Sequence, residues 1–470
     1  MSNAVNPDIY FLKTGNNDYL IVSPLQQISA CINSSAFQQI KAVLNNKKSI
    51  NLTNNLDALL HDLHSFKGCD PFFENREIDP LFLGLIPTEG CNLKCRYCHF
   101  NTSGLPEQMD IKTAFSLVDW MIKTVKNRNR DTLKIHFFGG EPLTAMDFVS
   151  NVIHYARAEA ARANLATWFE VTTNGVISPR TAIFIGTYFD AVVLSFDGFK
   201  KYHDKYRVNN NGKGSFDLVS ATANILKELP VKLCFRICVT SKSVEELEQI
   251  TCWFCKNFRP CVIDYEPLKT PPEKIVITDK TTAADSFSPP SPFLFAQNYL
   301  KAQKAAAHFG VEAVYSAVTG AEIRNSFCPV GQDTVIVFPD GRISSCYLPL
   351  NQLTPHGVDF NIGVVENRKT IVIDDEKLMA LRSINKEKTR CSKCFCKYSC
   401  AGGCHADNTL PGCSDSYTDF CIQTRIISAF NILKSLGLNK KAEKFINNRQ
   451  DQKRVARASS DQLIADLSGN

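Results

Sequence analysis

The sequence predicts an α/β protein built around a partial (β/α)6 TIM-like barrel. Three observations support this prediction. Short β-rich runs alternate with amphipathic helical stretches between residues 81 and 266, and strand–helix–strand repeats imply a parallel sheet. Glycine-rich, cysteine-rich or acidic segments follow several of these runs. Because the loops of such a barrel gather at the carboxyl ends of its strands, we expect the active site there.

Six runs are expected to be the barrel strands because they are short and rich in β-branched and aromatic residues. They cover residues 81–86, 133–138, 169–173, 191–196, 232–239 and 262–266. Between the first two runs, apolar residues recur at spacings of four and three, which places them on one face of a helix. They are Ile111, Phe115, Val118, Ile122 and Val125.

Smaller units flank the barrel. Residues 8–23 alternate around a Gly-Asn-Asn-Asp turn and predict a hairpin; two helical patterns follow, so we expect a small α+β, winged-helix-like domain. Two proline-rich stretches, 269–274 and 288–292, indicate a linker that leads into a helix near 293–308. Residues 440–457 carry seven basic and two acidic side chains, and we expect a solvated basic helix there.

Length and composition are those of an ordinary multidomain globular protein. The chain has 470 residues, and its net charge of +6 gives no reason to expect nucleic acid or a membrane surface as a partner. Hydrophobic residues make up 44% and charged residues 21%, which excludes disordered and fibrous classes. No apolar run approaches the ~18 residues of a spanning helix, and the first residues lack a secretory pattern. We therefore expect a cytoplasmic protein.

The spacing of the cysteines is more informative than their number. Of 19 cysteines, three lie within residues 91–98 and nine within residues 328–421. In a reducing compartment such clustering indicates metal ligation rather than disulfide bonds.

The first cluster, Cys91, Cys95 and Cys98, follows the first predicted strand. Three thiolates in so short a loop can bind three irons of a cubane cluster and leave the fourth iron open. A zinc site is the alternative, but zinc normally takes four ligands and only His99 lies nearby in sequence.

The cysteine loop and the later strand ends together resemble the radical SAM enzymes, whose hallmark is C-x3-C-x2-C after the first barrel strand. Residues 138–142, Phe-Gly-Gly-Glu-Pro, end the second strand, and the resemblance implies that they meet the amino group of S-adenosylmethionine. Gly139 and Gly140 allow close backbone approach, and Glu141 offers an acceptor for an ammonium group. The resemblance further implies cofactor contacts from Tyr97 to the adenine, from Thr173, Ser195 and Asp197 at strand ends, and from Arg207 to a carboxylate.

The later cysteines resemble the seven-cysteine SPASM extension of these enzymes. Residues 334–346 read as a hairpin with a Pro-Asp-Gly turn, which carries Cys346 back toward Cys328. The resemblance implies a first auxiliary cluster on Cys328, Cys346 and Cys404, and a second on Cys391, Cys394, Cys400 and Cys421. The first set is one ligand short of four. Its fourth iron either binds substrate or is ligated by Cys396 or Cys413. Cys396 and Cys413 could equally be thiols that bind no cluster. A zinc ribbon is the alternative for this region.

The resemblance covers about residues 80–425 and implies S-adenosylmethionine and three [4Fe-4S] clusters as cofactors. Its chemistry is reductive cleavage of the sulfonium to a 5'-deoxyadenosyl radical that abstracts hydrogen from carbon. The implied domains are a leader-recognition-like domain (1–78), the radical SAM barrel (79–270), a linker and bridging helix (271–325), a SPASM domain (326–435) and a basic helical tail (436–470).

SPASM relatives mostly act on peptides, and the N-terminal unit resembles the domain with which ribosomal-peptide (RiPP) maturases bind an extended leader as an added strand. We therefore predict a maturase that cross-links a precursor peptide through a carbon–carbon, ether or thioether bond. A flavodoxin- or ferredoxin-type protein would supply electrons. The N-terminal unit could instead be a cap over the barrel edge, and a non-catalytic metal-binding peptide adaptor is a rival for the whole chain.

A formylglycine-forming, sulfatase-type maturase is the other alternative. Those enzymes carry an aspartate base just after the second SPASM cysteine, where this chain has Tyr347. Tyr347 and Asp340 are therefore the sequence candidates for a proton-accepting group, although Tyr347 also suits packing in the hairpin.

Overall fold

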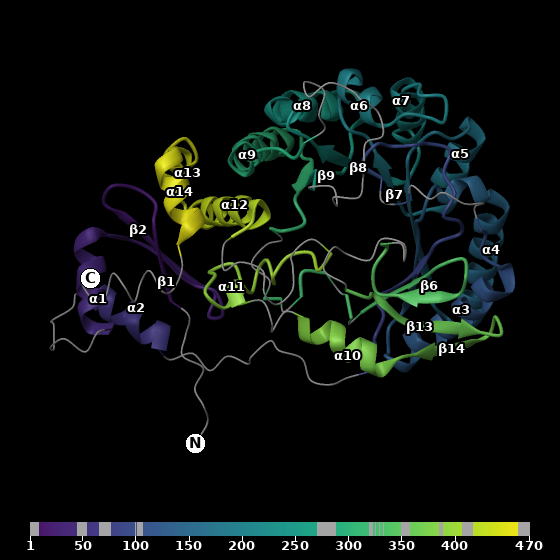
Figure 1. Cartoon of the computed structure of the whole chain (residues 1–470), viewed down its shortest axis with the longest axis horizontal. Helices are drawn as coiled ribbons and strands as arrows, with labels where there is room; N and C mark the ends of the chain where they lie inside the picture. Colours follow the sequence, from purple (N-terminus) through teal and green to yellow (C-terminus); the bar gives the residue numbers. More distant parts are fainter. Residues whose placement is uncertain are drawn as a thin grey trace.

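Figure 1 shows a computed structural model of the chain. The structure describes residues 9–44, 54–64, 77–98, 100, 107–269, 288–318, 323–324, 326–328, 330–331, 333–348, 358–384, 389–406 and 417–458. Most of the first proline-rich stretch lies outside these residues. None of the helices in the described ranges has the length and apolar character needed to cross a bilayer.

Six parallel strands, adjacent in chain order, form the centre of the protein, and all six predicted strands are confirmed. They are β4 (Phe82–Leu85), β5 (Thr132–Phe137), β6 (Ala166–Thr173), β7 (Ala191–Ser195), β8 (Lys232–Val239) and β9 (Val262–Pro267). The helices that connect or follow them are α3 (Ile111–Asn127), α4 (Met146–Arg162), α5 (Pro179–Tyr188), α6 (Lys200–Tyr206), α7 (Phe216–Leu226), α8 (Leu247–Phe258) and α9 (Pro292–His308), with 3-10 turns η1 (Pro142–Ala145) and η2 (Val244–Glu246). The α/β class with a mostly parallel sheet is confirmed.

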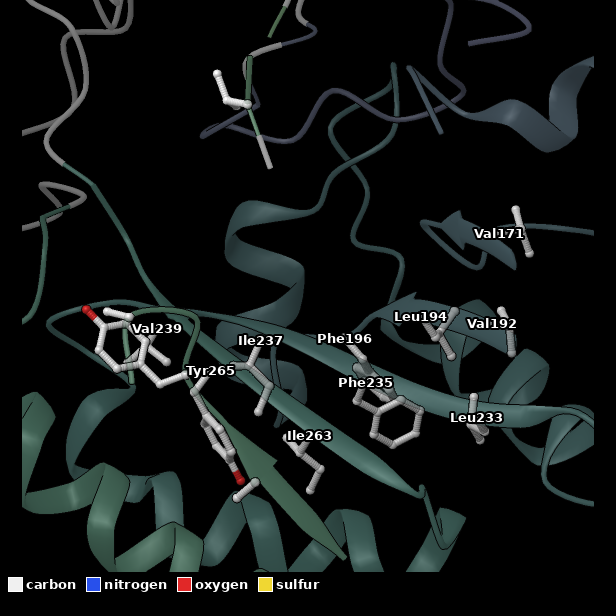
Figure 2. Packing of buried hydrophobic residues seen from close by; sticks show 14 of the residues in the cluster. Val171, Val192, Leu194, Phe196, Leu233, Phe235, Ile237, Val239, Ile263 and Tyr265 are labelled. Atoms are coloured by element: carbon white, nitrogen blue, oxygen red, sulfur yellow. The ribbon is translucent and has the colours of Figure 1, made fainter. Parts of the chain in front are cut away.

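Strand alternation separates an apolar layer from a polar interior. Every second residue of β5, β8 and β9 is buried in the main core, and Figure 2 shows Phe235, Ile237 and Ile263 in this layer. The intervening positions include His136, Arg236 and other polar residues, and strand geometry directs them to the opposite face. The helices therefore cover one face of the sheet, and ionisable groups line the other.

The large sheet continues beyond the barrel into the cysteine-rich region. The predicted hairpin is confirmed as β11 (Thr334–Val337) and β12 (Arg342–Ser344). β11 also pairs in parallel with β4, which the sequence did not predict. The outer strands are β10 (Glu312–Val314), beside β9, and β13 (Asn361–Glu366) and β14 (Thr370–Ile373), beyond β12.

A separate three-stranded antiparallel sheet forms the N-terminal unit. The predicted hairpin is confirmed as β1 (Tyr10–Lys13) and β2 (Asp18–Ser23), while β3 (Ile28–Asn33) was not predicted. The helices α1 (Ser34–Leu44) and α2 (Asn54–His64) follow. Both faces of the sheet are buried, because Leu12 and Leu20 belong to the main core whereas Ile21 packs with Ile40 and Leu63.

Five helices follow in the described C-terminal part of the chain, and the last two contact the N-terminal sheet. They are α10 (Asp375–Ser383), α11 (Thr389–Ser392), α12 (Asp419–Ser435), α13 (Asn439–Ile446) and α14 (Arg449–Arg457). Figure 1 shows α13 and α14 beside β1 and β2, and Lys441 pairs with Asp18 at 2.9 Å. The expected single solvated basic helix is wrong: this segment forms two helices, and Phe445 and Val455 are fully buried.

If the N-terminal sheet is docked as described, Leu20→Ala should destabilise the protein by about 2 to 5 kcal/mol, the usual cost of emptying a buried leucine site. Thermal or urea unfolding measures the change. Ile21→Ala is the matched control because it faces α1 and α2 within the unit. A near-neutral Leu20→Ala beside a destabilising Ile21→Ala would mean that the sheet does not rest on the body of the protein.

Candidate active site at the carboxyl ends of the barrel strands

The cysteine loop lies directly after β4, as predicted, and N–H groups point at two of its sulfurs. The Leu93 N–H donates to Cys91 Sγ at 3.4 Å, and the Phe100 N–H donates to Cys98 Sγ at 3.4 Å. The Asn174 amide, at the end of β6, approaches Cys91 Sγ at 3.5 Å. Hydrogen bonds of this kind stabilise thiolate ligands and tune the clusters that they hold.

Burial keeps the three thiols protonated unless a nearby cation compensates the negative charge of the thiolates. It raises the pKa of Cys91 and Cys95 to about 11 and also raises that of Cys98, while Arg207 lowers the pKa of Cys95 and Cys98. Metal binding displaces thiol protons and supplies the missing positive charge, so this donor set fits a metal cluster. Within the described ranges, no three His, Cys, Asp or Glu side chains converge as ligands of one metal ion would. His99 lies outside these ranges.

Gly139 and Gly140 fit tightly against the backbone that leads into the cysteine loop. The Gly140 N–H donates to the Thr88 carbonyl at 3.1 Å, and the Glu141 N–H donates to the Gly90 carbonyl at 2.8 Å. A Cβ at position 140 would lie 2.1 Å from the Gly90 oxygen, and Gly139 has a φ of +136°. The sequence predicted that these glycines allow the cofactor to approach the backbone. In the structure they allow the backbone that leads into the cysteine loop to pack closely against them.

Glu141 is 1% exposed and joins the second and third strand ends. Its carboxylate accepts from the Asn174 N–H at 2.7 Å, from the Thr173 hydroxyl at 2.9 Å and from the Leu143 N–H at 3.2 Å. Burial raises the pKa of Glu141 to about 7, although these donors act in the opposite direction. A carboxyl group that titrates near neutral pH is well placed to become charged when a cationic ligand group arrives.

Asp197, at the end of β7, brings the predicted residues Tyr97 and Arg207 together. It accepts from the Tyr97 hydroxyl at 2.5 Å, from Arg207 Nε at 3.0 Å and from the Cys238 N–H at 3.0 Å. The Arg207 guanidinium also lies 5.3 Å from the centre of the Tyr97 ring. The carboxylate that Arg207 pairs with here is therefore Asp197 itself, and Ser195 lies two residues before it on the same strand.

A second polar group lies on the interior face of the barrel and joins the sequence candidate Tyr347 to His136, which the sequence did not predict. His136 contacts the Tyr347 hydroxyl through Nδ1 at 2.5 Å and the Thr172 hydroxyl through Nε2 at 3.0 Å. Burial and the nearby Arg236 lower the pKa of His136 to about 3, and burial raises that of Tyr347 well above its usual value. Both groups are therefore neutral near pH 7. His136 belongs to no motif. Only its alternation with the buried residues Ile135 and Phe137 could have placed it on the polar face of β5.

The other sequence candidate for a proton acceptor, Asp340, lies away from His136 and Tyr347, close to Glu89 at the entrance to the cysteine loop. It lies in the turn between β11 and β12, at the opposite end of β12 from Tyr347. Its carboxylate binds Arg342 Nε at 3.1 Å and the Arg342 N–H at 3.1 Å. Nearness in sequence failed here because a hairpin strand separates its two ends in space.

Hydrogen bonds draw together the three segments that carry Cys328, Cys346 and Cys404. Ser326 contacts His405 at 3.3 Å, and the Gly331 N–H donates to the Ser345 hydroxyl at 3.0 Å. The residues between Cys400 and Cys404 all have positive φ, at +48°, +81° and +71° for Ala401, Gly402 and Gly403. This left-handed turn redirects the chain between the two cysteines.

Two members of the second expected cysteine group, Cys394 and Cys421, lie near the start of α12. Arg425 Nη1 donates to Cys394 Sγ at 2.8 Å, and burial together with Cys394 and Cys421 raises the pKa of Tyr417 to about 12. Cys396 is buried beside Cys394 and forms a side-chain hydrogen bond with it. Cys413, the other suggested extra ligand, lies outside the described residues.

Comparisons with known proteins agree on the barrel. The profile of the radical SAM superfamily matches residues 85–251. A cysteine-type anaerobic sulfatase-maturating enzyme of Clostridium novyi is 28% identical over 198 residues, or 40% of this chain and 51% of that protein. The radical SAM cyclopropyl synthase TigE of Paramaledivibacter caminithermalis is 24% identical over 188 residues, or 37% of this chain and 38% of that protein.

The matched parts amount to about half or less of these curated relatives. Among solved structures, native anSMEcpe with bound AdoMet aligns with a TM-score of 0.58 and 20% identity. That alignment covers 78% of this chain and 100% of the other. At this identity the likeness shows a shared fold.

Because a Cβ at position 140 would collide with fixed backbone, Gly140→Ala should displace the segment that enters the cysteine loop. We expect a clear loss of thermal stability and a reconstituted protein that binds less iron than the wild type. Gly15→Ala is the control, since its Cβ would meet only the flexible Asp18 carboxylate, at 3.2 Å. Wild-type iron content in Gly140→Ala would contradict the proposed role of this contact.

Proposed function

Residues 85–251 are a radical SAM domain, and from this premise we propose that the enzyme is a peptide maturase that forms an intramolecular cross-link in a precursor peptide. The bond would be a carbon–carbon, ether or thioether bond. The observation that carries the proposal is the meeting of the cysteine loop, the Gly-Gly-Glu motif and the Asp197 group at one edge of the parallel sheet.

In this proposal Cys91, Cys95 and Cys98 hold a [4Fe-4S] cluster, and S-adenosylmethionine binds beside it. When bound, the two groups together supply a carbon-centred radical that abstracts hydrogen from the substrate. Glu141 accepts the cofactor's ammonium group, with Thr173 fixing the carboxylate. Gly139 and Gly140 position the cysteine loop by packing against the backbone segment that precedes it.

The Asp197 group would bind the nucleoside half of the cofactor. Tyr97 presents its ring to the adenine, and Ser195 faces the ribose. Because three protein donors already occupy the Asp197 carboxylate, we assign it to orienting Tyr97 and Arg207 rather than to direct contact. The Arg207 guanidinium keeps N–H groups beyond Nε with which it can meet the cofactor's carboxylate.

We assign two auxiliary [4Fe-4S] clusters to the C-terminal cysteines. Cys328, Cys346 and Cys404 would hold the first, and Cys391, Cys394, Cys400 and Cys421 the second. The contact between Cys396 and Cys394 favours Cys396 as a neighbour of the second cluster over a fourth ligand of the first. Electrons for the enzyme would come from a flavodoxin- or ferredoxin-type protein.

The polar interior of the barrel would receive the reacting part of the peptide. Tyr347 directly follows a proposed cluster ligand and reaches His136 across the interior. Arg236 pairs with Asp264 at 2.7 Å on the neighbouring strands. Tyr347 is therefore our candidate for a group that touches the substrate, and as a neutral phenol it would donate or relay a proton.

The N-terminal sheet offers a place for a leader peptide. Within the described residues, β3 pairs only with β2, so its outer edge presents backbone groups to which an extended strand can be added. Leader recognition is therefore our proposal for residues 1–78, with a cap over the barrel edge as the alternative. Two solved structures of anSMEcpe contain bound peptides, and we propose a peptide substrate here as well.

A sulfatase-type maturase is the second candidate function, because a sulfatase-maturating enzyme is 28% identical over the matched region. Tyr347 stands where those enzymes need an aspartate base, and this favours the cross-linking reaction. Incubation with a cysteine-containing sulfatase peptide distinguishes the two. Formylglycine in the product would replace our proposal with this alternative.

The test of the proposed function begins with iron and acid-labile sulfide in protein purified without oxygen and reconstituted. Three [4Fe-4S] clusters give about 12 of each per chain. We expect reductive formation of 5'-deoxyadenosine from S-adenosylmethionine, and Cys91→Ala should abolish it while keeping about eight irons. Zinc without sulfide, or cofactor cleavage that survives Cys91→Ala, would refute the proposal.

The pKa of Glu141 predicts how cofactor binding depends on pH. Only the ionised carboxylate attracts an ammonium group, and burial raises its pKa to about 7. The ionised fraction therefore falls as the pH drops, and S-adenosylmethionine should bind roughly fivefold more weakly at pH 6 than at pH 7. Anaerobic calorimetric titration measures this. Glu141→Gln should bind more weakly at both values and lose the pH dependence; an unchanged dependence would place the titrating group elsewhere.

A further inference from the structure

Among the residues that the structure describes, Arg425 is a buried cation without a carboxylate partner. It lies on α12 and is 1% exposed. Within the described ranges, no Asp or Glu lies within ion-pair distance of its guanidinium, whereas Arg207, a buried arginine of the barrel, pairs with Asp197. Burying a charge without a counter-charge costs desolvation free energy, so another group must compensate the guanidinium.

The other contacts of Arg425 are polar but carry no full charge. Nε and Nη2 donate to the Val455 carbonyl at 3.4 and 3.3 Å, and Nη2 also donates to the Ala458 carbonyl. These carbonyls lie at the C-terminal end of α14, the negative end of the helix dipole, and the Val455 carbonyl also accepts from the Ala458 N–H at 3.3 Å. The guanidinium carbon lies 4.0 Å from the centre of the Tyr417 ring. These contacts position the group and only partly compensate its charge.

The remaining partner is sulfur, because Nη1 donates to Cys394 Sγ at 2.8 Å. A neutral thiol is a weak acceptor, whereas a thiolate carries the charge that the guanidinium needs. Cys421 precedes Arg425 by four residues on the same helix, which puts both on one face of α12. The cation therefore faces the two cysteines that the proposed function gives to the second auxiliary cluster.

We propose that Arg425 is the counter-charge of the second auxiliary cluster and raises its reduction potential; this rests on the cluster layout of the proposed function. A reduced cluster carries one more negative charge than an oxidised one, so a nearby cation and an N–H···S bond stabilise the reduced form more. Arg425 is a positioning residue that acts through the cluster and does not touch the substrate.

A raised reduction potential would make the second auxiliary cluster a stronger electron acceptor during the reaction. Joining a C–H carbon to an X–H group removes two hydrogens: one leaves as an atom to the radical, and the other leaves as a proton and an electron. The second cluster, if bound in its oxidised form, would supply an acceptor for that electron, and the proton would pass to an interior group or to water. The raised potential makes this transfer more favourable.

The test compares midpoint potentials in reconstituted, full-length protein, followed by electron paramagnetic resonance during a mediated titration. Arg425→Met removes the charge and the donors, whereas Arg425→Lys keeps the charge and can keep one donor. In Arg425→Met we expect the reduction equilibrium constant of one cluster to fall at least tenfold. For a one-electron couple this lowers the midpoint potential of its signal by about 59 mV. Arg425→Lys should shift less, with iron content unchanged in both.

Asn448→Ala is the matched control, because Asn448 caps the start of α14 without touching Arg425 or Cys394. Unchanged potentials in that variant exclude a general effect of a loosened C-terminal segment. If Arg425→Met keeps about 12 irons and all its potentials, or if Asn448→Ala reproduces the shift, the proposal is wrong while the proposed function stands. If both Arg425 variants lose one cluster, the residue holds the cluster rather than tuning it. A wild type with about four irons refutes the layout itself.

Discussion

The site depends on the backbone contact between residues 88–90 and the two glycines after β5. Gly140 and Glu141 donate to the Thr88 and Gly90 carbonyls, and no Cβ fits between the two segments. This contact fixes the height of the cysteine loop above the sheet and, through Glu141, links it to the end of β6. The glycines therefore join the strand ends into one rigid surface before any cofactor binds.

Burial of ionisable groups is the second recurring feature. Glu141 and the loop thiols have raised pKa values because water is excluded around them, and His136 is held neutral for the same reason. Such groups become charged at low cost only when an opposite charge arrives. For Glu141 and the loop thiols such a partner would be positive, whereas for His136 it would be negative.

The two ends of the chain meet over the cysteine-rich region. Tyr10 of β1 lies with its ring centre 6.5 Å from that of Phe395, next to Cys394. Arg425 contacts Cys394 and the end of α14, and Lys441 of α13 pairs with Asp18 of β2. The N-terminal sheet thus rests on residues that also surround Cys394.

The sequence by itself determined the six strands, the helix 111–127, the hairpin 334–346 and the cofactor motifs, because hydrophobic periodicity, turn residues and cysteine spacing are local signals. Only the tertiary structure decided that β11 joins β4, that His136 reaches Tyr347 while Asp340 lies elsewhere, and that the basic segment is buried on its apolar side. The partners are far apart in sequence, by 211 positions for His136 and Tyr347 and by 423 positions for Lys441 and Asp18. They are chosen by packing and charge balance across the whole molecule, which no local pattern records.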